Sequence, residues 1–461
     1  MPRQIRGDAD FAVVSPDGQQ IAFRTTREGH QLWVMGANGE DARMLLKAEP
    51  GVRFGRLQWS PDSRSLAFLR YHSDAQKYDV AIVDHNLQTG SSEVLVSDYG
   101  LGAFGWLADG RIIFSRAEAG SRQAESNLWE LPVDAGTGKA QGEPRRITRW
   151  AGFSFRDFSA TADGKRLVFV RQHQQTDVHV AEFNSRGAEP VTVRRLTFDV
   201  SQDQPTAWTP DGRAVLFHSD RNGTWDVFRQ DVAQAAPDEL VVGPQEQHEA
   251  RLTPDGTALL YWDHPRLEGV YPPSIRLLRT PLGGGSTSTV LEARWGAQFR
   301  CAQAAKMCVL SEPSADGKRL DFSAFDPLQG KRTNLSSVDL YPEGNPRWDV
   351  SPDGATAAIA DSDRENRRAR LVVLSSGEQR HTEALPARIS DVAWLPDGRG
   401  LLVTTTHGRG SSVFRLGLNG EAHEIWQAPT QISRPVPSPD GKRFAFALST
   451  LDSNAWMVEG F

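Results

Sequence analysis

The sequence predicts an all-β protein folded as a β-propeller of four-stranded antiparallel blades. The first observation is a tetrapeptide of the type Ser-Pro-Asp-Gly that occurs nine times, from Ser15–Gly18 to Ser438–Gly441. Neighbouring copies start 43 to 54 residues apart, except for one gap of 98 residues after the copy at Thr253. A fixed period in this range is typical of a repeat architecture. The second observation is that no segment shows sustained helical periodicity.

Each repeat contains four short runs of the kind that form strands. In the first repeat, Phe11–Val14 leads into the turn and Ile21–Phe23 follows it. A third run, Leu32–Met35, comes after a polar loop, and the more polar Met44–Leu46 closes the unit. Short alternating runs separated by turn residues indicate strands, and four of them in about 45 residues match one propeller blade. In the turn, Pro presets φ, Asp bonds the backbone two residues on, and Gly accepts positive φ. The repeated aspartates are therefore interpreted as structural.

Ten repeats are expected in total. The segment 295–335 keeps the strand pattern without the regular turn and is interpreted as a divergent repeat. The tenth repeat stops at its third run, Trp456–Val458, and Arg3–Arg6 is predicted to supply its fourth strand and so remove the open sheet edges. This closure favours one ring in a single domain, 1–461, with two smaller propellers as the alternative. The predicted blades are 10–48, 51–97, 100–149, 151–199, 203–243, 246–291, 295–335, 343–385, 388–428, and 431–461 together with 1–6.

Charge and hydropathy exclude several classes of partner. The net charge is -6 and the pI is near 6.0, so no basic field is available to bind nucleic acid. No run of 18 apolar residues predicts a transmembrane helix, and the N-terminus lacks the apolar segment of a signal peptide. We expect a monomer that binds a protein partner, a peptide or a small polar ligand.

Cys301 and Cys308 are the two cysteines. They flank a predicted hairpin turn, where facing Cβ atoms lie close to disulfide geometry. A disulfide and a pair of buried thiols are both compatible with this pattern. A disulfide would indicate an oxidising compartment. An extracytoplasmic location is favoured, and a cytoplasmic one is the alternative.

Catalytic and cofactor motifs are missing from the sequence. It contains no Gly-x-Ser-x-Gly elbow, Walker motif, His-Glu-x-x-His or dinucleotide fingerprint. Asp361–Asn366 resembles a cation-binding loop only faintly, because the closing Gly and the distal Glu are absent. We therefore expect no metal, no cofactor and no enzymatic activity.

The candidate binding site lies where the first strands of the blades begin, on the face opposite the tight turns. Polar and aromatic side chains at these points converge on the channel mouth and are predicted to bind a polar ligand or peptide. The candidates are Arg156, Asp157, Asp203, Gln204, His248, Trp295, Arg300, Arg347, Asp391 and Arg434. Tyr271, in the long loop Asp263–Ser274, could serve as a lid or docking element. The alternative is that these residues only solvate the channel and pair with one another.

The segments Trp208–Gly212 (WTPDG) and Leu216–Phe228 resemble the repeat of the TolB-like, Pro-Asp type of propeller. A narrower resemblance lies in Cys301–Glu312, Phe322–Lys331 and the ending Asp452–Phe461. These segments are similar to the C-terminal propellers of bacterial Ser/Thr protein kinases and winged-helix transcriptional regulators. That resemblance implies a sensor or interaction domain of a signalling protein. The alternatives are a scaffold or gating propeller of an envelope or peptidase complex and a metal-dependent polysaccharide lyase.

Overall fold

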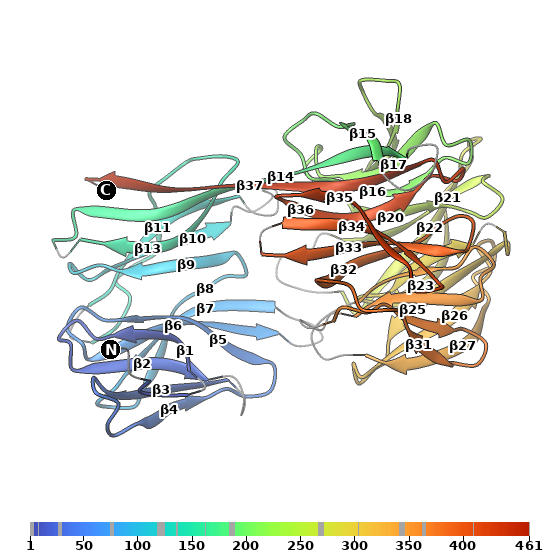
Figure 1. Cartoon of the computed structure of the whole chain (residues 1–461). Helices are drawn as coiled ribbons and strands as arrows, with labels where there is room; N and C mark the ends of the chain where they lie inside the picture. The colour runs from blue at the N-terminus through green and yellow to red at the C-terminus, as the bar shows by residue number, and fades with distance from the viewer. Residues whose placement is uncertain are drawn as a thin grey trace. The chain divides into compact units, whose positions relative to one another are not determined.

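The computed structural model describes residues 4–7, 9–25, 30–73, 78–117, 125–134, 137–161, 163–183, 190–265, 272–302, 304–340, 346–361, 366–408 and 410–460. This part of the chain is all-β and contains no helix, which confirms the predicted fold class (Figure 1). It holds nine antiparallel sheets, of which eight have four strands paired in sequence order. It includes no helix able to cross a membrane.

The repeated turn joins the first and second strands of a blade. In the copy at Thr209, the Thr209 hydroxyl donates to Asp211 Oδ1 at 2.6 Å, and the Arg213 amide donates to the same oxygen at 3.0 Å. The Gly212 amide donates to the Thr209 carbonyl at 2.8 Å. Gly212 has φ 65°, a conformation that favours glycine. The turn aspartate thus fixes a tight hairpin, and this role explains its recurrence.

The chain divides into two compact units, Met1–Gln174 with Asp452–Phe461, and Gln175–Arg266 with Pro272–Leu451. In the first unit the first strands of successive blades are in contact, β1 with β5, β5 with β9 and β9 with β13. Its four-stranded sheets are β1 (Asp10–Val14), β2 (Gln20–Thr25), β3 (Gln31–Gly36), β4 (Arg43–Lys47); β5 (Val52–Trp59), β6 (Ser65–Ser73), β7 (Tyr78–Asn86), β8 (Ser92–Ser97); and β9 (Leu101–Trp106), β10 (Arg111–Ala117), β11 (Ser126–Pro132), β12 (Arg145–Arg146).

The second unit contains five complete four-stranded sheets. They are β16 (Asp203–Trp208), β17 (Ala214–Ser219), β18 (Asp226–Asp231), β19 (Asp238–Val241); β20 (Glu246–Leu252), β21 (Ala258–His264), β22 (Ser274–Pro281), β23 (Ser288–Arg294); β24 (Gln298–Ala302), β25 (Met307–Pro313), β26 (Arg319–Phe325), β27 (Arg332–Asp339); β28 (Arg347–Val350), β29 (Thr356–Ala360), β30 (Arg370–Val373), β31 (Gln379–His381); and β32 (Arg388–Trp394), β33 (Gly400–His407), β34 (Gly410–Gly417), β35 (Ala422–Ala428).

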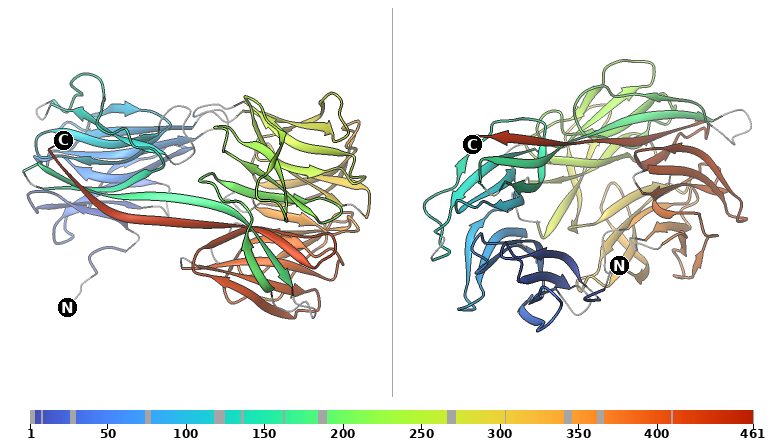
Figure 2. Two further views of the ribbon diagram at one scale, coloured as in Figure 1. Left: turned by 90° about the horizontal axis from the view of Figure 1, so that it is seen from above. Right: turned by 60° about the vertical axis from the view of Figure 1, so that its left-hand side comes forward.

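The ninth sheet consists of β13 (Ser154–Ala160), β14 (Arg166–Phe183), β15 (Pro190–Arg195), β36 (Gln431–Pro437) and β37 (Arg443–Glu459). Two long strands, β14 and β37, run antiparallel along their length (Figure 2). In the first unit, Arg166 forms an ion pair with Glu459 at 2.7 Å, and β13 completes a three-stranded blade. In the second unit, Thr176 Oγ1 lies 2.8 Å from Ser449 Oγ, and β36 and β15 complete a four-stranded blade. Each long strand therefore contributes one half to each unit.

The second unit closes into a ring of six blades. Its first strands are in contact in the order β16, β20, β24, β28, β32 and β36, and β36 in turn contacts β16. The Trp208 indole donates to the Val436 carbonyl at 2.8 Å, and Arg443 Nη2 donates to the Gly212 carbonyl at 2.6 Å across this closure. Between the sheets, Phe217 and Phe228 are fully buried with ring centroids 5.7 Å apart. Burying such a side chain stabilises the fold by about 1.5–3 kcal/mol.

The contacts of the second unit fit a smaller propeller of six blades, as in the alternative of two propellers. The first unit shows the contacts from β1 to β13 given above, and the arrangement of the whole chain as one ring or two propellers stays a prediction. The predicted closing strand is corrected, because Gln4–Arg6 form no strand and Arg3 lies outside the described residues. The Arg6 guanidinium instead lies over the rings of Phe23 and Trp33, at 5.5 and 5.0 Å from their centroids. This packing places the N-terminal segment against the first blade, which explains why it is not available to the last one.

Candidate functional site

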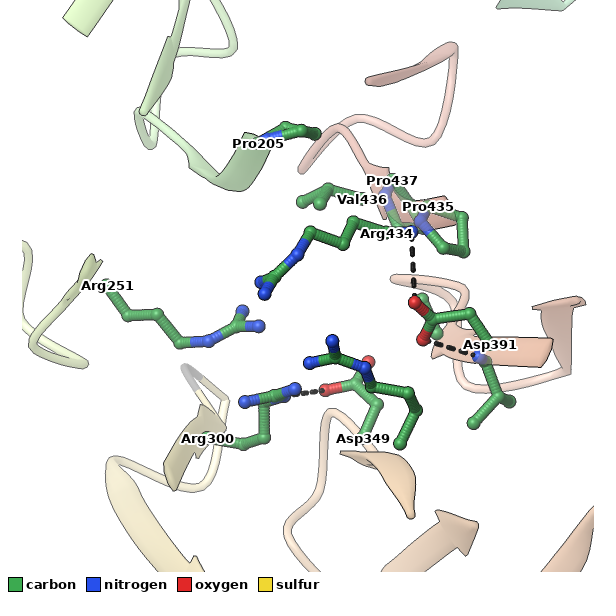
Figure 3. A pocket seen from close by; sticks show the side chains of 12 residues that line it. Pro205, Arg251, Arg300, Asp349, Asp391, Arg434, Pro435, Val436 and Pro437 are labelled. Carbon is green, nitrogen blue, oxygen red and sulfur yellow. Dashed lines mark hydrogen bonds and ion pairs between the residues drawn. The ribbon is translucent and has the colours of Figure 1, made fainter. Parts of the chain in front are cut away.

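A small cavity of about 50 Å³ lies among the first strands of the second unit (Figure 3). Most of the residues that line it occupy two positions of the repeat. One lies four residues, and the other two residues, before the first residue of the Pro-Asp-Gly turn. Pro205, Arg347, Asp391 and Arg434 occupy the earlier position, and Arg251, Asp349, Ala393 and Val436 the later one. Arg300, from the blade without the regular turn, also lines the cavity. The repeat itself therefore brings charged side chains from several blades to one place.

Backbone bulges direct two of the side chains in this region. Glu249 and Arg434 both have positive φ, 55° and 52°, and each lies where the pairing of the first and second strands shifts register. A β-bulge bends its strand and re-aims side chains, and it is common beside binding sites. The left-handed conformation costs free energy for a residue other than glycine. Here it brings Glu249 and Arg434 together as an ion pair.

Glu249 is the central carboxylate beside the cavity. Its Oε1 accepts a hydrogen bond from Arg434 Nη1 and lies 3.9 Å from Arg347 Nη1. Its Oε2 lies 3.9 Å from Arg300 Nη1. Burial raises the pKa of Glu249, but the charges of Arg434, Arg300 and Arg347 outweigh burial and hold that pKa well below its usual value. Glu249 is therefore ionised at neutral pH.

Each of the two aspartates that line the cavity accepts a hydrogen bond from a backbone amide in the first strand of the next blade. Asp391 accepts from the Val392 amide and the Arg434 amide, both at 2.9 Å. Asp349 Oδ2 accepts from the Trp394 amide at 2.8 Å, and its Oδ1 lies 3.8 Å from Arg300 Nε. Burial raises the pKa of Asp349, although Arg251 and Arg300 act in the opposite direction. These carboxylates link adjacent blades and also offset part of the arginine charge.

Arg251 differs from the other arginines of the cavity. Its Nε is buried and has no hydrogen-bond partner among the described residues. The guanidinium groups of Arg251, Arg300 and Arg434 point toward the same space (Figure 3). Burial lowers the pKa of Arg251, while Asp349 and Glu249 counteract that effect. Burial also lowers the pKa of Arg300 to about 10, which leaves it charged at neutral pH. The cavity thus presents a concentration of positive charge.

The structure brings together four of the predicted site residues, Arg300, Arg347, Asp391 and Arg434. Asp203 is buried and forms an ion pair with Arg221 at 3.1 Å. Gln204 pairs with His218 on the neighbouring strand of the same blade. These two positions support the blade that contributes Pro205 to the cavity. Their role in ligand binding stays a prediction.

His248 and Trp295 belong to an aromatic cluster of the second unit. His248 Nε2 lies 3.0 Å from His264 Nε2, and the His264 ring packs against Trp295 at 5.1 Å between centroids. Burial lowers the pKa of His248 to about 4, and the charge of His264 acts in the same direction. His248 is therefore neutral at pH 7.

Arg156 and Asp157 belong to the first unit, so the predicted residues do not all line the cavity described above. Asp157 forms an ion pair with Arg56 of the same unit. Tyr271 lies outside the described residues. Sequence reasoning missed Arg251 and Asp349 as cavity residues. Their signal was present, because both lie two residues before a Pro-Asp-Gly turn.

Cys301 and Cys308 form a disulfide between β24 and β25. The structure therefore agrees with the disulfide interpretation of these cysteines and not with a pair of buried thiols. Asp361, at the start of the faint cation-binding motif, accepts a hydrogen bond from Arg370 at 2.6 Å. Ser362–Glu365 of that motif lie outside the described residues. In the part of the chain that is described, no group of three or more His, Cys, Asp and Glu side chains is placed to hold a metal ion.

The fold and the cavity define this protein as a β-propeller with an arginine-rich cavity in a six-bladed unit. No family model matches the chain. It is 44% identical over 71 residues to the uncharacterised peptidase YuxL of Bacillus subtilis, a match covering 15% of this chain and 10% of that protein. It is 24% identical over 247 residues to dipeptidyl-peptidase 5 of Porphyromonas gingivalis, covering 49% of this chain and 33% of the relative. A solved TolB-type structure from Agrobacterium tumefaciens is 16% identical with a TM-score of 0.47, covering 60% of this chain and 99% of that one.

These relatives correct one expectation from the sequence. The absence of catalytic motifs led us to expect no enzymatic activity, whereas relatives of this chain are named as peptidases. The expectation was wrong because it rested on catalytic motifs alone. The similarity instead lies in propeller repeats, whose residues are set by turns and core packing. The chain spans one third or less of YuxL and of dipeptidyl-peptidase 5.

Proposed function

We propose that this protein acts in peptide hydrolysis, and that its second unit holds or admits a peptide at the arginine-rich cavity. The observation that carries the proposal is the convergence of Arg251, Arg300, Arg347 and Arg434 with two aspartates on one small cavity of a closed six-bladed ring. A concave site with a few fixed polar groups is the usual form of a ligand site. The names of the peptidase relatives supply the class of ligand.

The gating or scaffold role in a peptidase complex, one of the alternatives that the sequence left open, agrees better with these relatives than the signalling sensor does. YuxL and dipeptidyl-peptidase 5 give no support to a kinase or winged-helix partner. The lyase alternative requires metal-binding histidines, and among the described residues no group of three or more His, Cys, Asp and Glu side chains is placed to hold a metal ion. We therefore retain the peptide-handling role as the proposal.

Peptide binding and peptide hydrolysis by the purified chain test this proposal. We expect fluorescein-labelled mixed peptides to bind in an anisotropy titration, with fluorogenic peptides assayed in parallel for cleavage. Ala393→Met, which fills the cavity, should weaken binding at least about tenfold, equivalent to about 1.4 kcal/mol. Ala422→Met, at an exposed position of the same unit, is the matched control.

The fold of each variant is checked by its circular dichroism melt. Ala393→Val provides a smaller change should the methionine variant unfold. A wild-type chain that neither binds nor cleaves peptides would refute the proposed function. A folded Ala393→Met variant that binds as tightly as wild type would show that the cavity is not the peptide site.

A further inference from the structure

We propose that Arg251 and its neighbouring arginines bind an oxyanion, and specifically the free C-terminal carboxylate of a peptide. This inference rests on the proposed function, since it names the part of the peptide that the cavity recognises. It starts from the uneven distribution of partners among the four arginines. Arg434 has Glu249, Arg300 donates to the Phe299 carbonyl at 2.7 Å, and Arg347 lies within ion-pair distance of Glu249. Arg251 has no such contact among the described residues.

The local charge balance favours an added anion. Four guanidinium groups meet three carboxylates in this region, those of Glu249, Asp349 and Asp391. The two aspartates already use oxygens to accept backbone amides, and Glu249 interacts with three arginines. Placing like charges together away from water is costly unless an opposite charge compensates them. One further negative charge within reach of Arg251 would balance the four positive ones.

The size and walls of the cavity limit what that anion can be. A volume of about 50 Å³ exceeds the roughly 10–15 Å³ that one water needs, and it suits a small group rather than a complete side-chain ring. Pro205, Pro435, Val436 and Pro437 form an apolar part of the wall. Such walls exclude water and strengthen charge interactions. A terminal carboxylate fits this space.

The type of cation also matters. A guanidinium presents a planar fork of donors that can bind both oxygens of a carboxylate, whereas a lysine ammonium is a point charge. All four cations of the site are arginines, and each comes from the first strand of a different blade. Inorganic phosphate has the same oxyanion chemistry, so the experiment must separate a peptide terminus from the free ion.

Two labelled peptides that differ only at the C-terminus provide the test, one ending in a free carboxylate and the other in a carboxamide. Their affinities are measured on wild type, Arg251→Met, Arg251→Lys and the control Arg229→Met. Arg229 is a surface arginine of the same unit that pairs with Asp238 at 2.6 Å. We expect wild type to bind the free acid at least about tenfold more tightly, as for a charged hydrogen bond. Arg251→Met should abolish this preference, Arg251→Lys should retain part of it, and Arg229→Met should keep it whole.

Each alternative result has a separate meaning. Equal binding of both peptides by wild type would overturn the carboxylate inference and leave the proposed function standing. Binding of neither peptide would overturn the proposed function. In that case, a thermal shift by inorganic phosphate that is lost in Arg251→Met would assign the site to a free oxyanion and reject the peptide terminus. A preference for the free acid that survives in folded Arg251→Met would reject Arg251 as its source.

Discussion

Glu249 of the second unit and Asp157 of the first occupy the same place in their blades, four residues before the turn. Both have left-handed backbone, with φ of 55° and 56°, and both form an ion pair with an arginine. Their surroundings differ, because the side chain of Glu249 is 9% exposed and that of Asp157 is 61% exposed. The bulge therefore presents a carboxylate in both units, and burial decides whether it becomes a surface ion pair or the centre of a charged network.

The strongest test of this comparison replaces each carboxylate by its amide. Glu249→Gln leaves Arg434 without its buried partner and should destabilise the second unit by about 3–5 kcal/mol. Asp157→Asn affects an exposed pair and should cost about 0–1 kcal/mol. Hydrogen exchange measured by mass spectrometry on peptides from each unit gives the two effects separately. Comparable losses in the two variants would mean that burial is not what distinguishes the sites.

The disulfide offers a second, smaller contrast, because both cysteines lie in the second unit. Replacing Cys301 and Cys308 by serine should lower the free energy of unfolding of that unit by about 2–3 kcal/mol, since the unfolded chain regains the freedom that the bond removed. The first unit should be unaffected. Chemical denaturation with exchange readout checks this, and an equal loss in both units would contradict independent stability.

The pH dependence of the first unit should respond to Asp84 of β7. Asp84 is 4% exposed, and burial raises its pKa to about 6. The unfolded value is about 3.9, so the folded unit binds the proton more tightly than the unfolded chain does. Stability from this group is present at low pH and is lost as the pH rises from about 4 through about 6. Asp84→Asn should remove this loss, which we expect to be about 3 kcal/mol, since each pKa unit corresponds to about 1.4 kcal/mol.

Asp177 of β14 is the matching control in the second unit. Burial raises the pKa of Asp177 to about 6, although the charge of Arg195 acts in the opposite direction. Denaturation between pH 4 and 8 is followed for each unit. In Asp84→Asn the pH dependence should flatten in the first unit only. If the profile of the first unit stays unchanged, Asp84 is not the group responsible.

The fold could be predicted from sequence because its signals are local. A Pro-Asp-Gly turn such as Thr209–Gly212 fixes a hairpin within a few residues, and the alternating runs beside it define strands. The division into two units could not be predicted in this way. It depends on the pairing of β14 with β37, whose residues lie more than 250 positions apart, as in the hydrogen bond between Thr176 and Ser449.

The cavity was only partly predictable for a related reason. Arg300, Arg347, Asp391 and Arg434 could be selected because they lie in the first strands of their repeats, which the propeller fold predicts to surround its channel. Arg251 stands out because its Nε lacks a hydrogen-bond partner among the described residues, whereas Arg434 is paired with Glu249. Such pairing depends on contacts between blades. A polar residue near the turn in one repeat carries no information about its partners in other repeats.

The two long strands have a consequence for synthesis on the ribosome. The first unit contains the residues up to Gln174. Its blade of β13 and β14 is complete only when the residues from Asp452 onward have been synthesised. At about 5–20 residues per second, the intervening 277 residues take roughly 15–60 s to emerge. Throughout that interval the half of β14 in this unit has a free edge, which makes the nascent chain dependent on whatever shields that edge until the last strand arrives.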